Sequence, residues 1–377
     1  MKVYYLTVAT IPSTTAHAAY VLSLGRALGL AGVPTIIGAC RPNIDHTDSV
    51  NAELPSNVKL ETFSVITRSA SSRILSLFFH VLFSNVKFDP DCLVITHNPL
   101  IAVALSIKKI PFFFDIHAVA GKGRLIQYIL RSKYLQGCLY VSKQIGVKLR
   151  EKFFELSCPQ MVLGCGIWAS EFADMKSSYD ARKEKLIPEN SIVIGYVGSM
   201  GEHRGIDLLL QSASELKDLP KNYFWLFVGG RPEQISEWEK YALSLGLSEQ
   251  HFRFVGHQPQ SSLKDWYACT DILCAPYSLK LSTAQVMDPM KLYEYVAAKK
   301  NIIVSDIQTT QDALENCKNV WFVEPDSTSS LVSAVLSASE QSIIQSNKSD
   351  ENDFLKGKTW EDKVSMLIEW LEAYKLT

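Results

Sequence analysis

The sequence predicts an α/β protein made of two doubly wound domains, each built on a parallel sheet. Its 377 residues exceed the usual size of one domain and suit two domains of about 150–200 residues each. Short runs rich in β-branched and aromatic residues alternate with longer stretches of helical periodicity. The runs are apolar throughout, as parallel strands covered by helices on both faces are. A polar stretch at 177–190 separates the runs into two series.

The predicted strands alternate with helices in the order that builds βαβ units. One of these helices carries clear end signals, because Ser13, Thr14 and Thr15 can cap a helix over 16–31 and Gly32 can close it. The first series of strands comprises 3–9, 34–39, 58–65, 92–97, 111–116, 138–141 and 160–163, and the second comprises 191–198, 223–228, 252–255, 271–275, 301–305 and 319–323.

The polar stretch at 177–190 has the composition of a linker, with a charged run at 182–185 and Pro188. We therefore expect an N-terminal domain over 1–185, a second domain over 186–355, and a C-terminal helix over 356–377 that packs back toward the N-terminal domain. Open α/β sheets bind ligands beyond the carboxyl ends of their strands, so we expect the two domains to face a shared cleft.

Charge is distributed unevenly along the chain. The formal net charge is only −1, which implies no nucleic-acid partner. Residues 1–185 carry 21 basic against 13 acidic side chains, a net of +8, and the remainder carries 17 against 26, a net of −9. Residues 101–150 hold nine of the basic groups and one acid, Asp115. A basic surface for an anionic partner and a merely solvated basic face both fit this pattern.

The cysteines and the apolar runs indicate the cellular compartment of the protein. The eight cysteines are scattered, several within apolar runs, and form no CxxC pair or ligand-like cluster, which is typical of a reducing compartment. The apolar run at 1–9 is too short for a signal peptide, and no 18 consecutive residues are apolar. We expect a cytoplasmic protein, attached at most to the inner face of the cell membrane.

The segment from Asp288 to Ala298 is the first candidate binding site. Pro289 precedes a helical run, and a helix that starts there leaves backbone N–H groups of its first turn free for an anion. Lys291 and Glu294 are three residues apart and so share a helix face. The carboxylate could accept hydrogen bonds from a vicinal diol such as a ribose. The alternative is an ordinary Lys–Glu pair on the surface.

The segment 194–210 is the second candidate, a strand followed by a glycine-bearing turn and an amphipathic helix. Gly198 and Gly201 permit close approach of the backbone to a phosphate, and Arg204 can pair with it in a bidentate manner. The segment is neither a GxGxxG fingerprint nor a Walker A loop, so it does not indicate a dehydrogenase or a P-loop enzyme. A plain βα turn is the alternative.

Together these segments resemble the nucleotide-binding half of family 4 glycosyltransferases, which have the GT-B fold. The family's ordered motifs are a "Y/F-V-G … K/R-G" loop, strands ending in "V-G-G" and "F-x-G", "A-D-I-x-x-x-P", and "S-P-x-K-x-x-E-Y-x-A". The corresponding segments here are Gly198–Gly205, Val228-Gly229-Gly230, Phe254-Val255-Gly256, Thr270 to Pro276 and Asp288–Ala297. The "P-M-K-L-x-E-Y" form is that of many bacterial cell-surface polysaccharide enzymes.

The resemblance implies two Rossmann-like domains and transfer of a sugar, with retention of configuration, from a UDP- or GDP-type sugar nucleotide. The acceptor would be a glycan or a polyprenyl-diphosphate-linked glycan, and no cofactor would be bound permanently. Glu294 would bind the ribose and Arg204 would neutralise the diphosphate. The other residues implied at the donor are Ser13, Gly198, Ser199, Gly201, Gly229, Tyr277, Pro289, Met290, Lys291 and Leu292.

The N-terminal half matches the family less closely. The loop from Ile11 through Ser13 to His17 follows the first strand, as the family's loop over the diphosphate does. Asp115-Ile116-His117 ends the fifth strand and resembles the family's "E/D-x-H", which implies that His117 contacts the donor sugar or the reacting centre. The alternative for His117 is a structural histidine whose hydrogen bonds are satisfied.

The sequence departs from the family pattern at two positions, and this leaves alternative functions open. Val286 stands where the family has the first glutamate of a Glu-x7-Glu pair, and Ser199 stands where a basic residue often follows the loop glycine. Asp288 is a possible substitute for the missing carboxylate. One alternative is a non-catalytic partner subunit with the same fold, and another is a sugar-nucleotide 2-epimerase. No Asp-x-Asp motif is present, so we expect no metal requirement.

Two basic amphipathic stretches, 72–87 and 124–135, suggest where the protein meets its acceptor. The first combines Arg73 with many large apolar residues, and the second places Arg124 and Arg131 among leucine, isoleucine and tyrosine residues. Both suit helices lying on an anionic membrane that carries a lipid-linked acceptor. Packing of both against the core of the sheet is the alternative.

Overall fold

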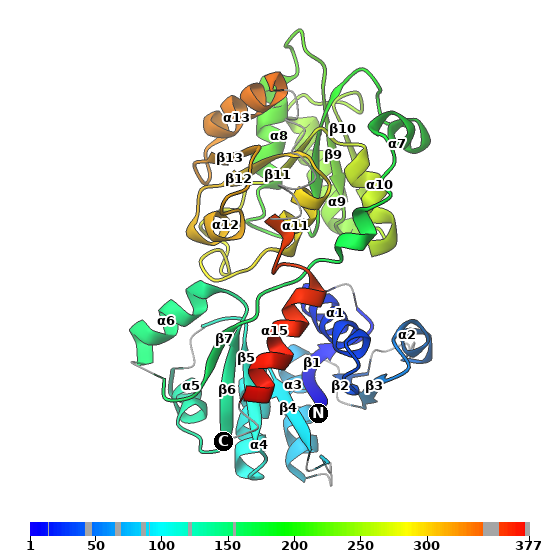
Figure 1. Cartoon of the computed structure of the whole chain (residues 1–377). Coiled ribbons are helices and arrows are strands. Elements are labelled where there is room, and N and C mark those ends of the chain that lie inside the picture. Colours follow the sequence, from blue (N-terminus) through cyan, green and yellow to red (C-terminus); the bar gives the residue numbers. More distant parts are fainter. Residues whose placement is uncertain are drawn as a thin grey trace. The chain divides into compact units, whose positions relative to one another are not determined.

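The computed structural model describes the chain except for residues 14, 42–46, 65–68, 84–87, 90, 120–122, 154–155, 342–353 and 374–377. The described residues divide into two compact units (Figure 1). Unit 1 comprises Met1–Gly166 and Trp360–Thr377, and unit 2 comprises Ile167–Thr359.

Unit 1 is built on a seven-stranded sheet in the order β3-β2-β1-β4-β5-β6-β7, with every neighbouring pair parallel. Each of the seven runs predicted in the first series forms a strand, so that prediction is confirmed. The strands are β1 (Lys2–Thr10), β2 (Thr35–Cys40), β3 (Val58–Phe63), β4 (Cys92–Thr96), β5 (Phe112–Ile116), β6 (Leu135–Tyr140) and β7 (Gln160–Val162).

The helices of unit 1 flank this sheet (Figure 1). The first of them begins as predicted, because the Thr15 side chain accepts a hydrogen bond from the Ala18 backbone N–H and caps the helix. Its buried face includes Val21, Leu24 and Leu28. The helices are α1 (Ala16–Leu30), α2 (Thr47–Glu53), α3 (Ala70–Phe83), α4 (Pro99–Ile107), α5 (Gly123–Leu130), α6 (Lys143–Phe153) and α15 (Trp360–Ala373).

Unit 2 is built on a six-stranded parallel sheet in the order β10-β9-β8-β11-β12-β13, and each predicted run of the second series forms one of its strands. The strands are β8 (Ile192–Val197), β9 (Tyr223–Val228), β10 (Phe252–Gly256), β11 (Ile272–Ala275), β12 (Asn301–Ser305) and β13 (Val320–Val323). The helices are α7 (Ser178–Lys185), α8 (Ile206–Leu216), α9 (Pro232–Ser244), α10 (Leu263–Ala268), α11 (Met290–Ala297), α12 (Gln308–Ala313) and α13 (Thr328–Glu340), with short 3-10 turns at Ala169–Phe172 and Gln260–Ser262.

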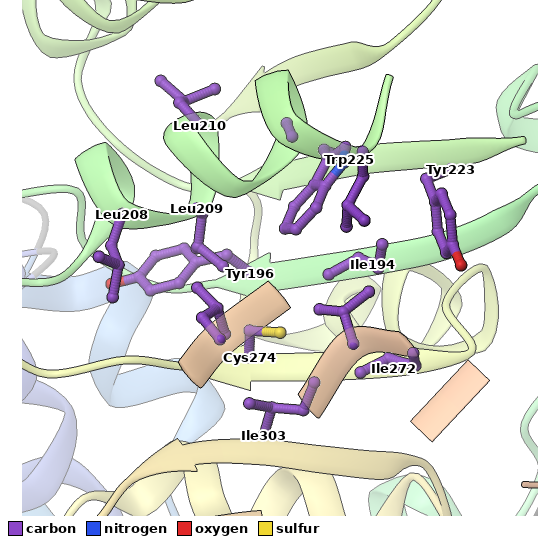
Figure 2. Packing of buried hydrophobic residues seen from close by; sticks show 14 of the residues in the cluster. Ile194, Tyr196, Leu208, Leu209, Leu210, Tyr223, Trp225, Ile272, Cys274 and Ile303 are labelled. Atoms are coloured by element: carbon purple, nitrogen blue, oxygen red, sulfur yellow. The ribbon is translucent and has the colours of Figure 1, made fainter. Parts of the chain in front are cut away.

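The core of unit 2 lies between its sheet and the helices α8 and α13. Figure 2 shows Leu209 of α8 with Tyr196 of β8 and Trp225 of β9, all about 1% exposed. Continuous burial of β8 and β9 explains why these strands lack polar alternation, since helices cover both faces of the sheet. The rigid core fixes the strand ends from which the site loops emerge.

From composition we expected the boundary between the two domains to lie between residues 185 and 186. The structure instead divides the chain after Gly166 and again before Trp360. The polar helix α7 belongs to unit 2 because Arg182, only 7% exposed, donates from Nε to the Cys269 carbonyl (2.9 Å) and from Nη2 to Asp271 Oδ2 (2.6 Å). A charged segment is therefore anchored here instead of serving as a linker. Helix α15 belongs to unit 1, where the Trp360 ring packs 5.5 Å from the Tyr20 ring.

Each sheet contains one point at which the strand order reverses direction. In unit 1 this switch point lies between β1 and β4, and in unit 2 it lies between β8 and β11. Doubly wound sheets bind ligands beyond the carboxyl ends of the strands at such a point. The loops after β8 and β11, and those after β1 and β4, are therefore the places to look for a site.

Candidate donor site at the switch point of unit 2

Glycines bring the strand ends of unit 2 unusually close together. Gly198 follows β8 with φ of 142°, and a Cβ built there would lie 2.6 Å from the Nζ atom of Lys291. A Cβ at Gly229, which follows β9 with φ of 120°, would lie 2.1 Å from the Gly198 carbonyl oxygen. Side chains at either position would push these loops apart. By contrast, a Cβ at Gly201 would meet no atom within 4 Å.

Helix α11 is fixed at the carboxyl ends of β8 and β11 by a buried tyrosine. The Tyr295 hydroxyl accepts a hydrogen bond from the Val197 N–H (3.3 Å) and lies 3.2 Å from the Cys274 carbonyl, to which it donates. Pro289 precedes the helix in an extended conformation, as predicted from the sequence. The first turn of α11 therefore lies beside the glycine-bearing loop.

Lys291 is buried at this point without a hydrogen-bonding partner among the described residues. Its Nζ atom lies 4.0 Å from the centroid of the Tyr196 ring and 5.7 Å from that of Tyr277. Burial lowers the pKa of the ammonium from its ordinary value of 10.5 to about 7, the positive charge of Arg204 acts in the same direction, and Glu294 opposes both. The site thus holds a poorly solvated cation with no counter-ion bonded to it.

Arg204 approaches the same aromatic surface from the loop before α8. Its guanidinium carbon lies 5.8 Å from the centroid of the Tyr277 ring. The following residue, Gly205, has φ of 80°, and a Cβ there would lie 2.0 Å from the Pro276 carbonyl oxygen. The tight packing of this loop on the end of β11 holds Arg204 close to Tyr277. Lys291 and Arg204 therefore both lie against the Tyr277 ring, and Lys291 also lies against Tyr196.

Glu294 occupies the next turn of α11 and is oriented by two side chains. Its Oε2 atom accepts a hydrogen bond from the Tyr267 hydroxyl (2.6 Å), and Oε1 accepts one from Gln260 Nε2 (2.9 Å). Each oxygen keeps acceptor capacity, so the carboxylate can still bind a diol. Among the described residues, Lys291 and Glu294 form no ion pair within 4 Å, which argues against a simple surface pair.

Sequence reasoning missed Tyr196, Tyr267 and Gln260 as parts of this site. Burial, with the neighbouring charge of Glu294, raises the pKa of Tyr267 well above its ordinary value, so its hydroxyl remains a donor to the carboxylate. Gln260 and Tyr267 come from the turn and helix between β10 and β11. No spacing motif connects Gln260 or Tyr267 with Glu294. The sequence does show Tyr267, an aromatic residue, seven positions after a polar turn.

The remaining residues predicted around α11 differ in their burial and in their hydrogen bonds. Met290 is half-buried in the first turn, whereas Pro289 is buried. Leu292 is 0% exposed and its N–H donates to the Pro289 carbonyl, so this residue packs inward. Val286 is 6% exposed, and the carboxylate of Asp288 accepts a hydrogen bond from the Tyr293 hydroxyl. Asp288, which precedes α11, is therefore bound to the Tyr293 side chain of that helix.

The other predicted residues lie in two places. Ser199 is exposed in the loop after β8, and its carbonyl accepts a hydrogen bond from the Tyr196 hydroxyl (2.6 Å). Ser13 and His117 belong to unit 1. Ser13 is exposed just before α1, and His117 follows β5 with its Nε2 atom 2.9 Å from Asp115 Oδ2. The structure thus brings the unit 2 residues together and places these two in the other unit.

The two basic stretches expected at a membrane correspond to α3 and α5. Leu77 and Val81 of α3 are buried, while Leu75, Phe79 and Phe83 are 48%, 50% and 76% exposed. Lys87 lies outside the described residues. Helix α5 buries its apolar face. None of the helices in the described ranges combines the length and apolar character needed to cross a bilayer, and those ranges hold no cluster of three or more potential metal ligands.

Comparison with known proteins agrees with this architecture. Residues 178–353 match the family model described as glycosyl transferases group 1, and this range contains the loop after β8 and the whole of α11. No curated protein matches the chain in sequence.

Among solved structures, the chain is similar to the sucrose-phosphate synthase of Thermosynechococcus elongatus, with 15% identity, a TM-score of 0.76 and all of both chains covered. It is similar to a glycosyltransferase of Rickettsia africae, with 17% identity, a TM-score of 0.74, and 99% of this chain and 98% of that chain covered. It is also similar to HepE of Anabaena in complex with UDP, with 14% identity, a TM-score of 0.73, and 99% of this chain and 100% of that chain covered. The chain therefore has the GT-B fold, and residues 178–353 carry the sequence pattern of the group 1 glycosyl transferases.

Proposed function

We propose that this protein is a glycosyltransferase that moves a sugar from a nucleoside-diphosphate sugar to a glycan acceptor. The observation that carries the proposal is the arrangement at the unit 2 switch point. There Lys291, whose Nζ atom has no hydrogen-bonding partner in the described part of the chain, and Arg204 both lie against the Tyr277 ring, and Lys291 is one helical turn from the oriented carboxylate of Glu294. Two cations suit a diphosphate, and a carboxylate suits the vicinal hydroxyls of a ribose. The match of residues 178–353 to glycosyl transferases supports this reading.

In this proposal the donor diphosphate lies against Arg204, Lys291 and the first turn of α11. The backbone at Gly198, Ser199 and Gly201 approaches the phosphates, and Glu294 accepts hydrogen bonds from the ribose. HepE, a structural neighbour of this chain, binds UDP and UDP-glucose, which favours a UDP-type donor over a GDP-type one. The burial of Val286 leaves recognition of the donor sugar to other groups.

We propose that the transfer retains the configuration at the anomeric carbon, as in the family 4 enzymes that the sequence resembles. The acceptor oxygen forms a bond to the anomeric carbon on the face from which the diphosphate oxygen departs, and that departing oxygen takes the acceptor proton. Lys291 and Arg204 stabilise the negative charge that develops on the leaving diphosphate. His117 contacts the reacting sugar, and Ser13 lies in the loop that approaches the diphosphate.

The test is binding of UDP, GDP, ADP and their common sugar conjugates, measured as thermal stabilisation of the full chain with and without magnesium. We expect one nucleoside diphosphate to raise the unfolding temperature in wild type and Glu294→Gln to abolish most of that shift. Glu239→Gln, a change of an exposed glutamate on α9, is the matched control. No shift with any nucleotide would indicate a non-catalytic subunit. Turnover of a sugar nucleotide without an acceptor would indicate an epimerase.

We further propose that α3 docks on the inner face of an anionic membrane, where a polyprenyl-diphosphate-linked acceptor for polysaccharide synthesis is held. Phe79 and Phe83 of α3 stack with ring centroids 5.9 Å apart on an exposed face. The neighbouring helix α4 ends in the exposed Ile107, followed by Lys108 and Lys109. Apolar side chains beside basic ones are what an anionic lipid surface binds, with about 1 kcal/mol for each basic group.

Co-sedimentation with vesicles that contain phosphatidylglycerol tests the docking proposal. At low salt we expect the wild-type chain to sediment with the vesicles and Phe79→Ser/Phe83→Ser to remain in solution. Leu243→Ser, which changes a leucine of α9 that is 60% exposed, should sediment like wild type. Equal sedimentation of all three proteins would refute the assignment to α3.

A further inference from the structure

Three histidines converge at the switch point of unit 1. His17 lies in the first turn of α1, after β1, while His97 follows β4 and His117 follows β5, so three neighbouring strands bring them to one place. The ring centroids of His17 and His97 are 3.9 Å apart, and that of His17 lies 4.9 Å from that of His117. Histidines packed this closely cannot all carry charge at low cost.

The first part of the cluster is an ion pair around a fully buried carboxylate. Asp115 is 0% exposed, and its Oδ2 atom accepts a hydrogen bond from the Tyr5 hydroxyl (2.6 Å) and lies 2.9 Å from His117 Nε2. Burial opposes ionisation of Asp115, but the charge of His117 and the bond from Tyr5 outweigh it and hold its pKa below the ordinary value. The buried carboxylate therefore lies against the Nε2 side of the His117 ring.

The second part is a pair of imidazoles that share one hydrogen bond. His17 Nε2 lies 3.1 Å from His97 Nδ1, so one ring donates and the other accepts. Protonation of both rings would place two N–H groups against each other. Burial lowers the pKa of His17 to about 4 and that of His97 well below 6.5, and the charge of His117 acts in the same direction on both. The pair is therefore neutral at pH 7.

The neutral pair and a tyrosine hold the ring of His117 from two sides. The His17 and Tyr20 rings each meet it nearly at right angles, with centroids 4.9 Å away. The Tyr20 ring is backed in turn by Trp360 of α15, at 5.5 Å. Because Nε2 is buried against Asp115, the 24% of the His117 side chain that is exposed belongs to its other atoms, away from Nε2. That edge is the part of the ring a ligand can reach.

We propose that His17 and His97 are positioning residues for His117, a hydrogen-bonded imidazole pair that fixes the orientation of its ring. This inference rests on the proposed function, in which His117 contacts the reacting sugar. The other titratable groups that face the cluster are Asp115 on β5, Tyr5 on β1 and Tyr20 on α1. His17 acts through its ring contact with His117, and His97 acts by holding His17.

Two variants of His97 test the proposal through the transfer reaction. His97→Leu removes one of the two side-chain partners of His17 Nε2 and leaves Thr7 Oγ1 at 3.3 Å, whereas His97→Asn keeps a hydrogen-bonding atom near the position of Nδ1. We expect His97→Leu to lower kcat by 10- to 100-fold, on the order expected for a misplaced catalytic group, with the donor KM changed by less than about threefold. His97→Asn should recover most of kcat. His251→Leu, a change at the amino end of β10 in unit 2, controls for loss of a histidine.

A readout without substrate separates this proposal from the proposed function. The ring nitrogen signals of His117, assigned by their loss in His117→Gln, are followed against pH in the free full-length chain. They should differ between wild type and His97→Leu and return toward wild type in His97→Asn. If wild type transfers no sugar, the proposed function fails, but these spectra still decide the coupling. Unchanged His117 signals, or equal kcat and pH profiles in His97→Leu and wild type, would overturn the positioning role.

Discussion

Binding of a nucleoside diphosphate should take up a proton at Lys291. In the free protein the pKa of this buried ammonium is about 7, so the group is largely neutral at pH 8 and above. A diphosphate beside Nζ favours the charged form and moves the pKa back toward its ordinary value of 10.5. Between those two values the protein must collect a proton before it can make the ion pair. The affinity should therefore fall as the pH rises.

The size of the effect follows from linkage. Each pH unit between the pKa of the free form and that of the bound form weakens binding by up to tenfold, about 1.4 kcal/mol. Because half of the free lysine is already neutral at pH 7, the Kd for UDP should rise by up to about 50-fold from pH 7 to pH 9. A terminal phosphate has its own pKa near 6, so its charge is constant over most of this range.

The assay is calorimetric titration of UDP at pH 7, 8 and 9, in two buffers of different ionisation enthalpy so that proton uptake is counted directly. Lys291→Arg should bind with a flat pH dependence because a guanidinium does not titrate here. Lys240→Met, which changes an exposed lysine of α9, should keep the wild-type slope. A flat wild-type profile, or the same slope in Lys291→Arg, would refute the assignment of the proton to Lys291.

Three further changes have definite expected outcomes. Gly198→Ala should lower the unfolding free energy by about 1–3 kcal/mol and abolish UDP binding, because its Cβ would lie 2.6 Å from Lys291 Nζ at φ of 142°; chemical denaturation and calorimetry check the two effects. Tyr267→Phe should weaken UDP binding several-fold while costing about 1 kcal/mol of stability, since Glu294 loses one of its two orienting donors; equal affinity in the variant would contradict this. Arg182→Met should destabilise unit 2 by roughly 3–5 kcal/mol, because buried carbonyl and carboxylate partners are left unpaired; an unchanged denaturation midpoint would show that α7 is not anchored as described.

The strands were predictable because their signal is local. Runs such as 191–198 and 223–228 are apolar without alternation, and in the structure β8 and β9 are buried along nearly their whole length. The start of α1 was predictable for the same reason, since the Thr15 cap lies beside the helix it caps. Local chemistry of this kind needs no knowledge of the tertiary fold.

The domain boundary was not predictable from composition. Residues 178–185 are polar and charged, which is equally typical of a linker and of a short helix anchored by one buried arginine. What decides between them is that Arg182 meets the carbonyl of Cys269 and the carboxylate of Asp271, which lie almost 90 residues later in the chain. A sequence without aligned relatives does not display such a pairing.

The candidate site shows the same division between local and distant information. The spacing of Lys291 and Glu294 on one helix, and the need for glycine at 198, follow from local rules. The tyrosine rings that surround Lys291 and the donors that orient Glu294 come from other strands and loops. His17 and His97, similarly, are isolated histidines 80 residues apart until the sheet order makes them neighbours.

The docking of α15 on unit 1 has a consequence for how the protein is made. Unit 2 is one continuous stretch of chain, whereas unit 1 needs residues from both sides of it. A chain that leaves the ribosome from its N-terminus can therefore finish unit 2 while unit 1 still lacks its last helix. Trp360, which backs the Tyr20 ring beside His117, arrives only then. The surroundings of the histidine cluster are thus completed only after the whole of unit 2, with its candidate site, has been synthesised.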